Sequence, residues 1–256
     1  MRPIHILRSQ LAADGLSQVK TVNVFNASDV SADGIEGNRM YKRDGTYYIL
    51  DDHPGDTTYI WKGTSLEPAW EWNHNPDTTR YTVNNGLTLS TATVTSDLYA
   101  ARNTLTHRIH GEFPVGTVAI DFTKMADGDF FGLAAFRDRS ASIGVFRNGS
   151  SYSLQVVHNM TQDESTWATT SNGTVVATAN ISGKKVWLRV SLDARASGTK
   201  AADFCYSTNG KTFMKLGPSY TMWTNWAYFM GYRFGIFNYA TKALGGSIFI
   251  SSFTSS

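Results

Sequence analysis

The sequence predicts an all-β protein built as a sandwich of two antiparallel sheets. No segment keeps a helical period of apolar residues over about 12 residues. Instead, about eleven short strand-like runs alternate with turn residues from Gly86 onwards. Frequent turns at this spacing are typical of sandwiches and barrels rather than of alternating α/β folds, and this many strands favour two stacked sheets.

The predicted strands follow one another to the end of the chain. They cover residues 86–90, 117–122, 130–136, 142–146, 153–157, 174–181, 185–193, 203–207, 212–216, 232–238 and 247–253. Residues 185–193 alternate apolar and polar side chains, which predicts one buried face. Residues 130–136 are almost wholly apolar, which predicts burial on both faces. Asn148-Gly149 and Asn209-Gly210 are hairpin-turn signals.

The first 64 residues have a different pattern. Strands are expected at 19–25 and 47–50, with one more short strand near 59–61, and a polar, glycine-containing stretch lies between the first two. So few strands do not form a stable core of their own. We therefore divide the chain into residues 1–64 and a sandwich domain of residues 65–256.

Composition excludes several function classes. Lys and Arg are scattered and the formal net charge is +2, so no basic stripe for nucleic acid is present. No apolar run is long enough for a transmembrane helix. The single cysteine, Cys205, excludes an intramolecular disulfide and is expected to be a small buried side chain.

Five Asn-x-Ser/Thr sequons, at Asn26, Asn148, Asn159, Asn172 and Asn180, favour a secreted, extracellular protein. Residues 1–14 lack the apolar region of a signal peptide. A chain that has lost its natural N-terminus would reconcile the two observations.

A segment near the N-terminus carries the first candidate chemistry. Residues 34–48 read GIEGNRMYKRDGTYY. They resemble the segment of family 43 glycoside hydrolases, five-bladed propellers acting on xylan- and arabinan-type sugars, that carries the general acid. The resemblance maps this acid onto Glu36, with Asn38 standing where the family commonly has proline. Glycoside hydrolysis uses such a group to protonate the leaving oxygen.

Hydrolysis with inversion also needs a second carboxylate about 6.5–9.5 Å from the first. The family places this group, and a third that tunes the acid, on earlier blades, whereas Asp14, Asp29 and Asp33 precede Glu36 in other contexts. We interpret residues 1–64 as part of a propeller and expect no hydrolysis by this chain alone. An active β-xylosidase or α-L-arabinofuranosidase with Glu36 as its acid is the alternative hypothesis.

Three later motifs resemble one domain in order. They are LEPAWEWNHNPD at 66–77, ARNTLTHR at 101–108 and MADGD at 125–129. Together they resemble the concanavalin A-like jelly-roll domain at the C-terminus of many family 43 enzymes, of the carbohydrate-binding module family 91 type. The resemblance implies an accessory domain that packs against the propeller, contributes a loop to the rim of its active site and, in some members, binds plant cell-wall xylan or arabinoxylan.

The Trp-rich motif offers the groups that sugars need. An aromatic face at Trp72 covers C–H faces of a sugar ring, and the side chains of Asn73, His74 and Asn75 bond its hydroxyls. The alternative is structural: Trp70 or Trp72 belongs to the core, and Asn73 and Asn75 shape a turn before Pro76.

Four arginines beside apolar strands, Arg102, Arg137, Arg139 and Arg233, add further candidates. A guanidinium forks onto sugar hydroxyls or onto a carboxylate. We keep Arg102 and Arg233 as sugar-binding candidates and expect ion pairs with Asp97, Asp121, Asp127 or Asp129 for most of the four. The aromatic stretch of Trp223, Trp226, Tyr228 and Tyr232 is expected in the core, with an exposed stacking platform as the alternative.

No cofactor is expected. Asp127-Gly128-Asp129 offers two oxygens, whereas calcium takes about six to eight, so a plain turn is the prediction. The six histidines show no zinc spacing. A third hypothesis is a truncated fragment that self-associates through the surface that would face a propeller.

Overall fold

The computed structural model describes residues 5–11, 18–26, 39–43, 46–50, 57–59, 63–225 and 230–256. It divides into two compact units, Met1–Gly55 and Asp56–Ser256. Among the described residues, no helix is both long and apolar enough to cross a membrane.

The first unit contains two antiparallel strand pairs. β1 (His5–Leu11) pairs with β2 (Gln18–Asn26), and β3 (Arg39–Arg43) pairs with β4 (Thr46–Leu50), where Tyr41 lies opposite Tyr48. The segment that resembles the acid-bearing motif is therefore a strand pair after residue 38, rather than the single strand expected at 47–50.

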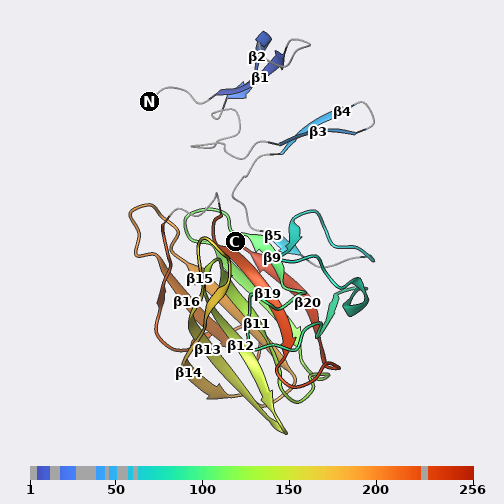
Figure 1. Ribbon diagram of the computed structural model, residues 1–256, viewed down its shortest axis with the longest axis vertical. Coiled ribbons are helices and arrows are strands. Elements are labelled where there is room, and N and C mark those ends of the chain that lie inside the picture. The colour runs from blue at the N-terminus through green and yellow to red at the C-terminus, as the bar shows by residue number, and fades with distance from the viewer. Residues whose placement is uncertain are drawn as a thin grey trace. The chain divides into compact units, whose positions relative to one another are not determined.

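The second unit is a sandwich of two antiparallel sheets, which confirms the predicted fold class (Figure 1). One sheet of nine strands has the order β17-β16-β15-β10-β20-β8-β7, with β18 beside β16 and β5 beside β20. Its strands are β5 (Thr57–Tyr59), β7 (Tyr81–Val83), β8 (Leu87–Ser90), β10 (Val115–Asp121), β15 (Lys185–Leu192), β16 (Ala201–Ser207), β17 (Met214–Lys215), β18 (Tyr220–Thr221) and β20 (Ser247–Ser255).

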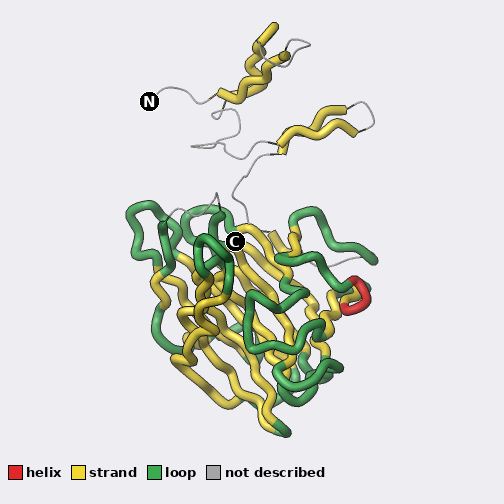
Figure 2. Tube along the Cα trace, viewed as in Figure 1, coloured by secondary structure: helices red, strands yellow, loops and turns green. Residues whose placement is uncertain are grey.

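The other sheet has seven strands in the order β14-β13-β12-β11-β19-β9-β6. They are β6 (Trp70–Trp72), β9 (Leu105–Arg108), β11 (Asp129–Phe136), β12 (Arg139–Asn148), β13 (Ser151–Gln162), β14 (Thr169–Asn180) and β19 (Arg233–Ala240). Strands dominate this unit, and a short 3-10 helix, η2 (Thr78–Arg80), is drawn in red among its loops (Figure 2).

Apolar side chains from both sheets form the main core between them. In β15, Val186, Leu188 and Val190 are fully buried, while the intervening side chains are partly exposed, as the alternation predicts. All eight residues of β11 are buried, which confirms burial on both faces.

The second face of β11 belongs to a separate apolar cluster on the outer side of the seven-stranded sheet. Phe130, Ala134 and Phe136 of β11 alternate with core residues and pack with Phe237 and other residues of this sheet. Leu98, Tyr99 and Ala101 complete the cluster. The segment before β9 therefore covers part of this outer face.

All eleven predicted strands of this domain are present, but four more were missed. β6, β7, β9 and β18 have two to four residues each, too short to show a period. Both hairpin signals mark turns: Asn148 pairs with Ser151 around Gly149, and Asn209 accepts backbone hydrogen bonds from Lys211 and Thr212.

Candidate functional site

The loop after β6, residues 73–77, is fastened to the segment before β9. The Asn73 amide donates to the Thr104 carbonyl at 3.0 Å. The buried Asn103 side chain makes two bonds to Asp77, accepting from its amide at 2.8 Å and donating to its carbonyl at 3.0 Å. Because both partners of Asn103 belong to one residue, the loop is held in a single register.

The other candidates of this loop contact the same segment. A ring nitrogen of His74, Nε2, bonds the Tyr99 carbonyl, and Arg102 Nε donates to the Asn75 carbonyl at 3.0 Å. Arg102 therefore supports the loop. Asn75 and Arg102 border an open surface hollow together with His74.

The two tryptophans of β6 lie against the core. Trp70 is buried and meets His107 and Phe253 edge-on, at ring centroid separations of 5.1 and 5.0 Å. Trp72 is half-buried and its ring centroid is 4.7 Å from that of Tyr81. This packing matches the structural alternative, and sugar contact by Trp72 stays a prediction.

A cleft of about 250 Å³ brings together Asn73, His74 and Arg233. Four other segments complete its lining: the end of β11 with the turn after it, the end of β13, the loop before β14, and the residues before β19. Their lining residues are Phe136, Arg137, Asp138, Gln162, Trp167, Met230 and Gly231. Trp167 is 39% exposed, and its carbonyl accepts a hydrogen bond from the Gln162 side chain at 2.9 Å.

Charged pairs fix the arginines around this cleft. Arg233 and Arg108 both contact Glu71 of β6, at 2.7 and 3.1 Å. Each oxygen of the Glu71 carboxylate thus takes one guanidinium. Arg233 therefore presents a guanidinium that a carboxylate already orients, which suits recognition of hydroxyl groups.

A buried ion pair lies in the wall of the same cleft. Arg137 Nε is 2.7 Å from Asp138 Oδ1, and the two side chains are 6% and 0% exposed. Arg137 also donates to the carbonyls of Trp223 and Asn225. Arg139 lies 4.0 Å from the Trp223 ring centroid and 3.8 Å from Glu164.

Arginine ion pairs were thus predicted correctly, but the predicted partners were wrong. Asp97 accepts from Thr169 and the Tyr99 amide, Asp121 accepts from Thr123, and Asp127 pairs with Lys242. Of the true partners, Asp138 is adjacent to Arg137 in the sequence, whereas Glu164 and Glu71 reach Arg139 and Arg233 only through the fold.

Three sequence candidates, Glu36, Trp226 and Tyr228, fall outside the described residues. Tyr232 is buried, as expected for the core, and its hydroxyl joins the Trp223 amide to the Arg139 carbonyl.

The predicted turn at 127–129 directs its two carboxylates apart. Asp127 pairs with Lys242 at 2.8 Å, whereas Asp129 is buried and accepts from the Ala126 amide at 2.7 Å. No group of three or more His, Cys, Asp or Glu side chains that could hold a metal occurs within the described ranges.

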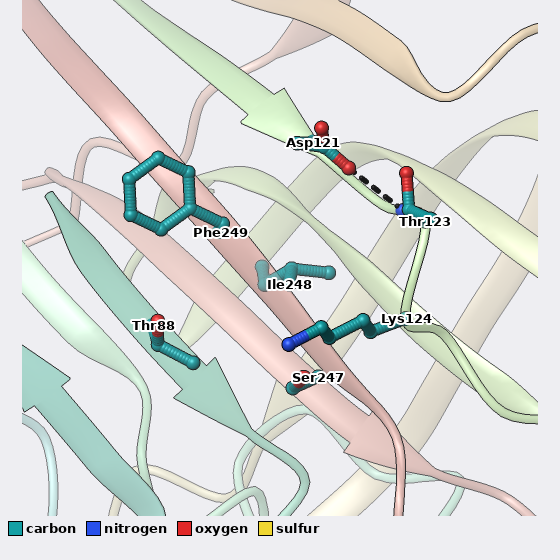
Figure 3. A pocket seen from close by; sticks show the side chains of 7 residues that line it. All are labelled: Thr88, Asp121, Thr123, Lys124, Ser247, Ile248 and Phe249. Atoms are coloured by element: carbon teal, nitrogen blue, oxygen red, sulfur yellow. Dashed lines mark hydrogen bonds between the residues drawn. The ribbon is translucent and has the colours of Figure 1, made fainter.

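A separate hollow of about 380 Å³ lies on the outer face of the nine-stranded sheet, and none of the predicted site residues line it. Thr88, Phe249 and Asp121 form one cross-strand row in it, since Phe249 lies opposite both of the others. Figure 3 shows the side chains that line this hollow, with a hydrogen bond from the Thr123 backbone amide to the Asp121 carboxylate. This hollow is therefore the alternative to the cleft as a ligand-binding site.

Sequence reasoning missed Trp167, Gln162 and Asp138. Trp167 had one available signal: it is an aromatic residue within the polar run 161–172. Trp167 lies in the loop between β13 and β14. Only the pairing of the strands brings this loop beside Asn73 and Arg233.

A family model matches residues 60–254, and it is described as the β-xylosidase C-terminal concanavalin A-like domain. This chain belongs to that family. The match covers most of the chain and confirms the resemblance drawn from the three motifs. No curated protein matches this chain.

Solved structures agree with this family. A family 43 glycoside hydrolase, engineered to display both endo-xylanase and exo-arabinofuranosidase activity, is 39% identical, with a TM-score of 0.75 over 84% of this chain and 44% of its own. A bifunctional family 43 and CE protein from Bacteroides eggerthii is 24% identical, with a TM-score of 0.70 over 86% of this chain and 30% of its own, and shows the fold alone. The chain thus spans less than half the length of either protein.

Proposed function

We propose that this chain is an accessory domain of a family 43 glycoside hydrolase and that it binds xylan-type polysaccharide in the cleft between Asn73 and Trp167. The observation that carries the proposal is the convergence of Asn73, His74, Arg233 and the half-exposed Trp167 on one cleft. These supply an amide, an imidazole, a guanidinium and an aromatic ring.

The chemistry of the cleft fits a neutral sugar chain. Arg233 is already paired with Glu71 and Arg137 with Asp138, so the cleft carries little uncompensated charge. Amides and paired guanidinium groups donate to hydroxyls, and an indole ring covers apolar C–H faces. The 39% identical protein was engineered to display both endo-xylanase and exo-arabinofuranosidase activity, which supports xylan or arabinoxylan as the polymer.

Affinity electrophoresis in gels containing xylan, arabinoxylan or cellulose tests the proposal. We expect retardation by xylan or arabinoxylan and a weaker effect of cellulose. Trp167→Ala removes the aromatic face and is expected to weaken binding roughly five-fold, about 1 kcal/mol. Unchanged mobility of the wild-type chain in all three gels would overturn the proposal.

A matched variant separates the two hollows. Phe249→Ala removes an aromatic ring of the nine-stranded sheet that is 36% exposed, close to the exposure of Trp167. We expect Phe249→Ala to bind like the wild type. If Phe249→Ala loses retardation and Trp167→Ala keeps it, the polymer binds at the competing hollow instead.

We also propose an extracellular location for this chain, supported by its five sequons. For the chain without a propeller partner, we propose self-association through the surface that a propeller would cover. Light scattering over a range of concentrations measures it, and a constant monomeric mass would contradict it.

A further inference from the structure

β14 is an unusual edge strand. It is the outermost strand of the seven-stranded sheet and, among the described residues, pairs only with β13. Its 12 residues, TTSNGTVVATAN, include no charge and no proline. The other strands that end the two sheet orders, β6, β7 and β17, have only three, three and two residues.

Such an edge offers its free backbone N–H and C=O groups to a strand of another molecule. Natural edge strands avoid this pairing with lysine, proline, β-bulges, short length or a cover. β14 has two register shifts against β13, at Val156/Val157 and Thr161/Gln162, but it also exposes Val175 and Val176, at 47% and 38%. An uncharged β-branched edge of this length predicts association between copies unless something else protects it.

Four of the five sequon asparagines lie on this side of the sheet. Asn148 ends β12, Asn159 lies in β13, and Asn172 and Asn180 belong to β14 itself. All four are exposed. The hydroxyl residues of three of these sequons, Ser150, Thr174 and Ser182, are exposed as well.

The register places the two β14 asparagines towards opposite ends of the edge strand. Asn172 lies opposite Met160, which packs in the outer apolar cluster, and Asn180 lies opposite Ser153. Asn172 is therefore on the outer face, where its side-chain amide donates to Ser96 at 3.3 Å. Eight residues of strand separate the two by roughly 26 Å.

We propose that Asn172 and Asn180 are N-glycosylated and that the glycans shield β14 from strand pairing. In this modification the Asn side-chain nitrogen bonds C1 of an oligosaccharide carried on a lipid diphosphate. The C1–O bond to the diphosphate breaks, the lipid diphosphate leaves, and the nitrogen loses one proton. The substituted amide keeps one N–H, so Asn172 can still donate to Ser96.

Two hydrated glycans about 26 Å apart occupy the space that an added strand would need. They provide the protection that the composition of β14 lacks. The inference does not depend on xylan binding, because Asn172 and Asn180 are not among the residues that line the cleft.

The test secretes the full chain from a eukaryotic host and maps glycopeptides by mass spectrometry. We expect glycans at Asn172 and Asn180. Thr174→Ala with Ser182→Ala removes both sequons while keeping the asparagines, and light scattering is expected to show at least twice the protein mass of the glycosylated wild-type chain. Adding Val175→Lys to it should return the protein mass to that of the wild type by placing a charge on the edge.

Each outcome decides one part of the proposal. Unmodified Asn172 and Asn180 in the secreted chain would overturn the proposed sites. Modified asparagines in the wild type, together with a Thr174→Ala, Ser182→Ala variant whose protein mass equals that of the wild type, would overturn the shielding. Removing the sequons of Asn148 and Asn159, by Ser150→Ala and Thr161→Ala, is the matched control and should leave the mass of the protein part unchanged.

Discussion

The buried carboxylate of Asp138 forms an ion pair with the neighbouring Arg137. The Asp138 side chain is 0% exposed, and neither of its oxygens has a hydrogen-bond partner among the described residues. Arg137 Nε, 2.7 Å from Oδ1, supplies the compensating charge, and the same guanidinium holds the carbonyls of Trp223 and Asn225. This pair therefore ties the turn after β11 to the segment before β19, and it forms one wall of the candidate cleft.

Arg137→Met should destabilise the protein strongly. It leaves the Asp138 carboxylate buried without a counter-charge, which costs about 3–5 kcal/mol in the free energy of unfolding. Urea unfolding measures this loss. Lys242→Met breaks the exposed pair with Asp127, with side chains 53% and 45% exposed, and should cost at most about 1 kcal/mol. Equal losses for the two variants would contradict the assigned role of the buried pair.

Asp129 gives stability a pH dependence of known sign. Burial raises the pKa of its carboxyl from 3.8 to about 6, against the lowering effects of the Ala126 amide and Arg147. Below about pH 4 the carboxyl is protonated in both the folded and the unfolded state. Between about pH 4 and 6 the folded state holds the extra proton, so the free energy of unfolding falls as pH rises.

Asp129→Asn should remove this loss, which amounts to about 2–3 kcal/mol. Burial lowers the pKa of His107 to about 4, and that group acts in the opposite direction, since its neutral form is the one the fold favours. Both proteins contain His107, so the difference between their urea-unfolding curves at about pH 4 and 7 isolates Asp129. Parallel pH profiles for the two proteins would rule out a raised pKa at Asp129.

At the scale of elements, packing on the outer face of β11 and β12 depends on two glycines, which have no side chain. Gly132 and Gly144 lie opposite each other in these strands. A Cβ at Gly132 would lie 2.3 Å from the Ile143 carbonyl oxygen and 2.6 Å from the Phe237 ring. The glycines thus leave room for the aromatic rings that fill the second face of the sheet.

Gly132→Ala should therefore overpack this face and reduce stability by about 1–3 kcal/mol. The carbonyl oxygen belongs to a neighbouring strand and moves only with that strand. Gly231→Ala is the control, because a Cβ there meets no described atom within 4 Å. Thermal unfolding of both variants tests the expectation, and a Gly132→Ala protein as stable as the control would contradict the close contact.

The elements also show how far sequence reasoning reaches. Alternation identified β15 and a continuous apolar run identified β11, because the pattern of apolar residues in each strand matches its burial. β14 was expected from residue 174 but begins at Thr169, since an exposed edge strand has no apolar period at its start. The cleft was only half predicted. Asn73 and His74 came from a motif and Arg233 from its place beside an apolar strand, whereas Trp167 and Asp138 reach the cleft through pairings between distant segments.

At the scale of the whole molecule, both proposed functions belong to the seven-stranded sheet of the sandwich. The main core joins the sheets, and the outer face of the seven-stranded sheet carries the second apolar cluster, the candidate cleft and the sequons on β14. Sugar binding and glycan attachment are therefore proposed for one sheet, at separate places. This arrangement allows each to be removed by variants that leave the other intact.

The last prediction concerns hydrolysis by the chain as it stands. Glu36 is the one carboxylate that the sequence places in an acid-like motif, and hydrolysis of a glycoside needs a pair of them. A lone acid has no partner to activate water or to attack the sugar. We therefore expect no turnover of aryl xyloside or aryl arabinofuranoside above the rate of a Glu36→Gln variant. A wild-type rate that Glu36→Gln abolishes would instead make this chain an enzyme and require a second carboxylate among its residues.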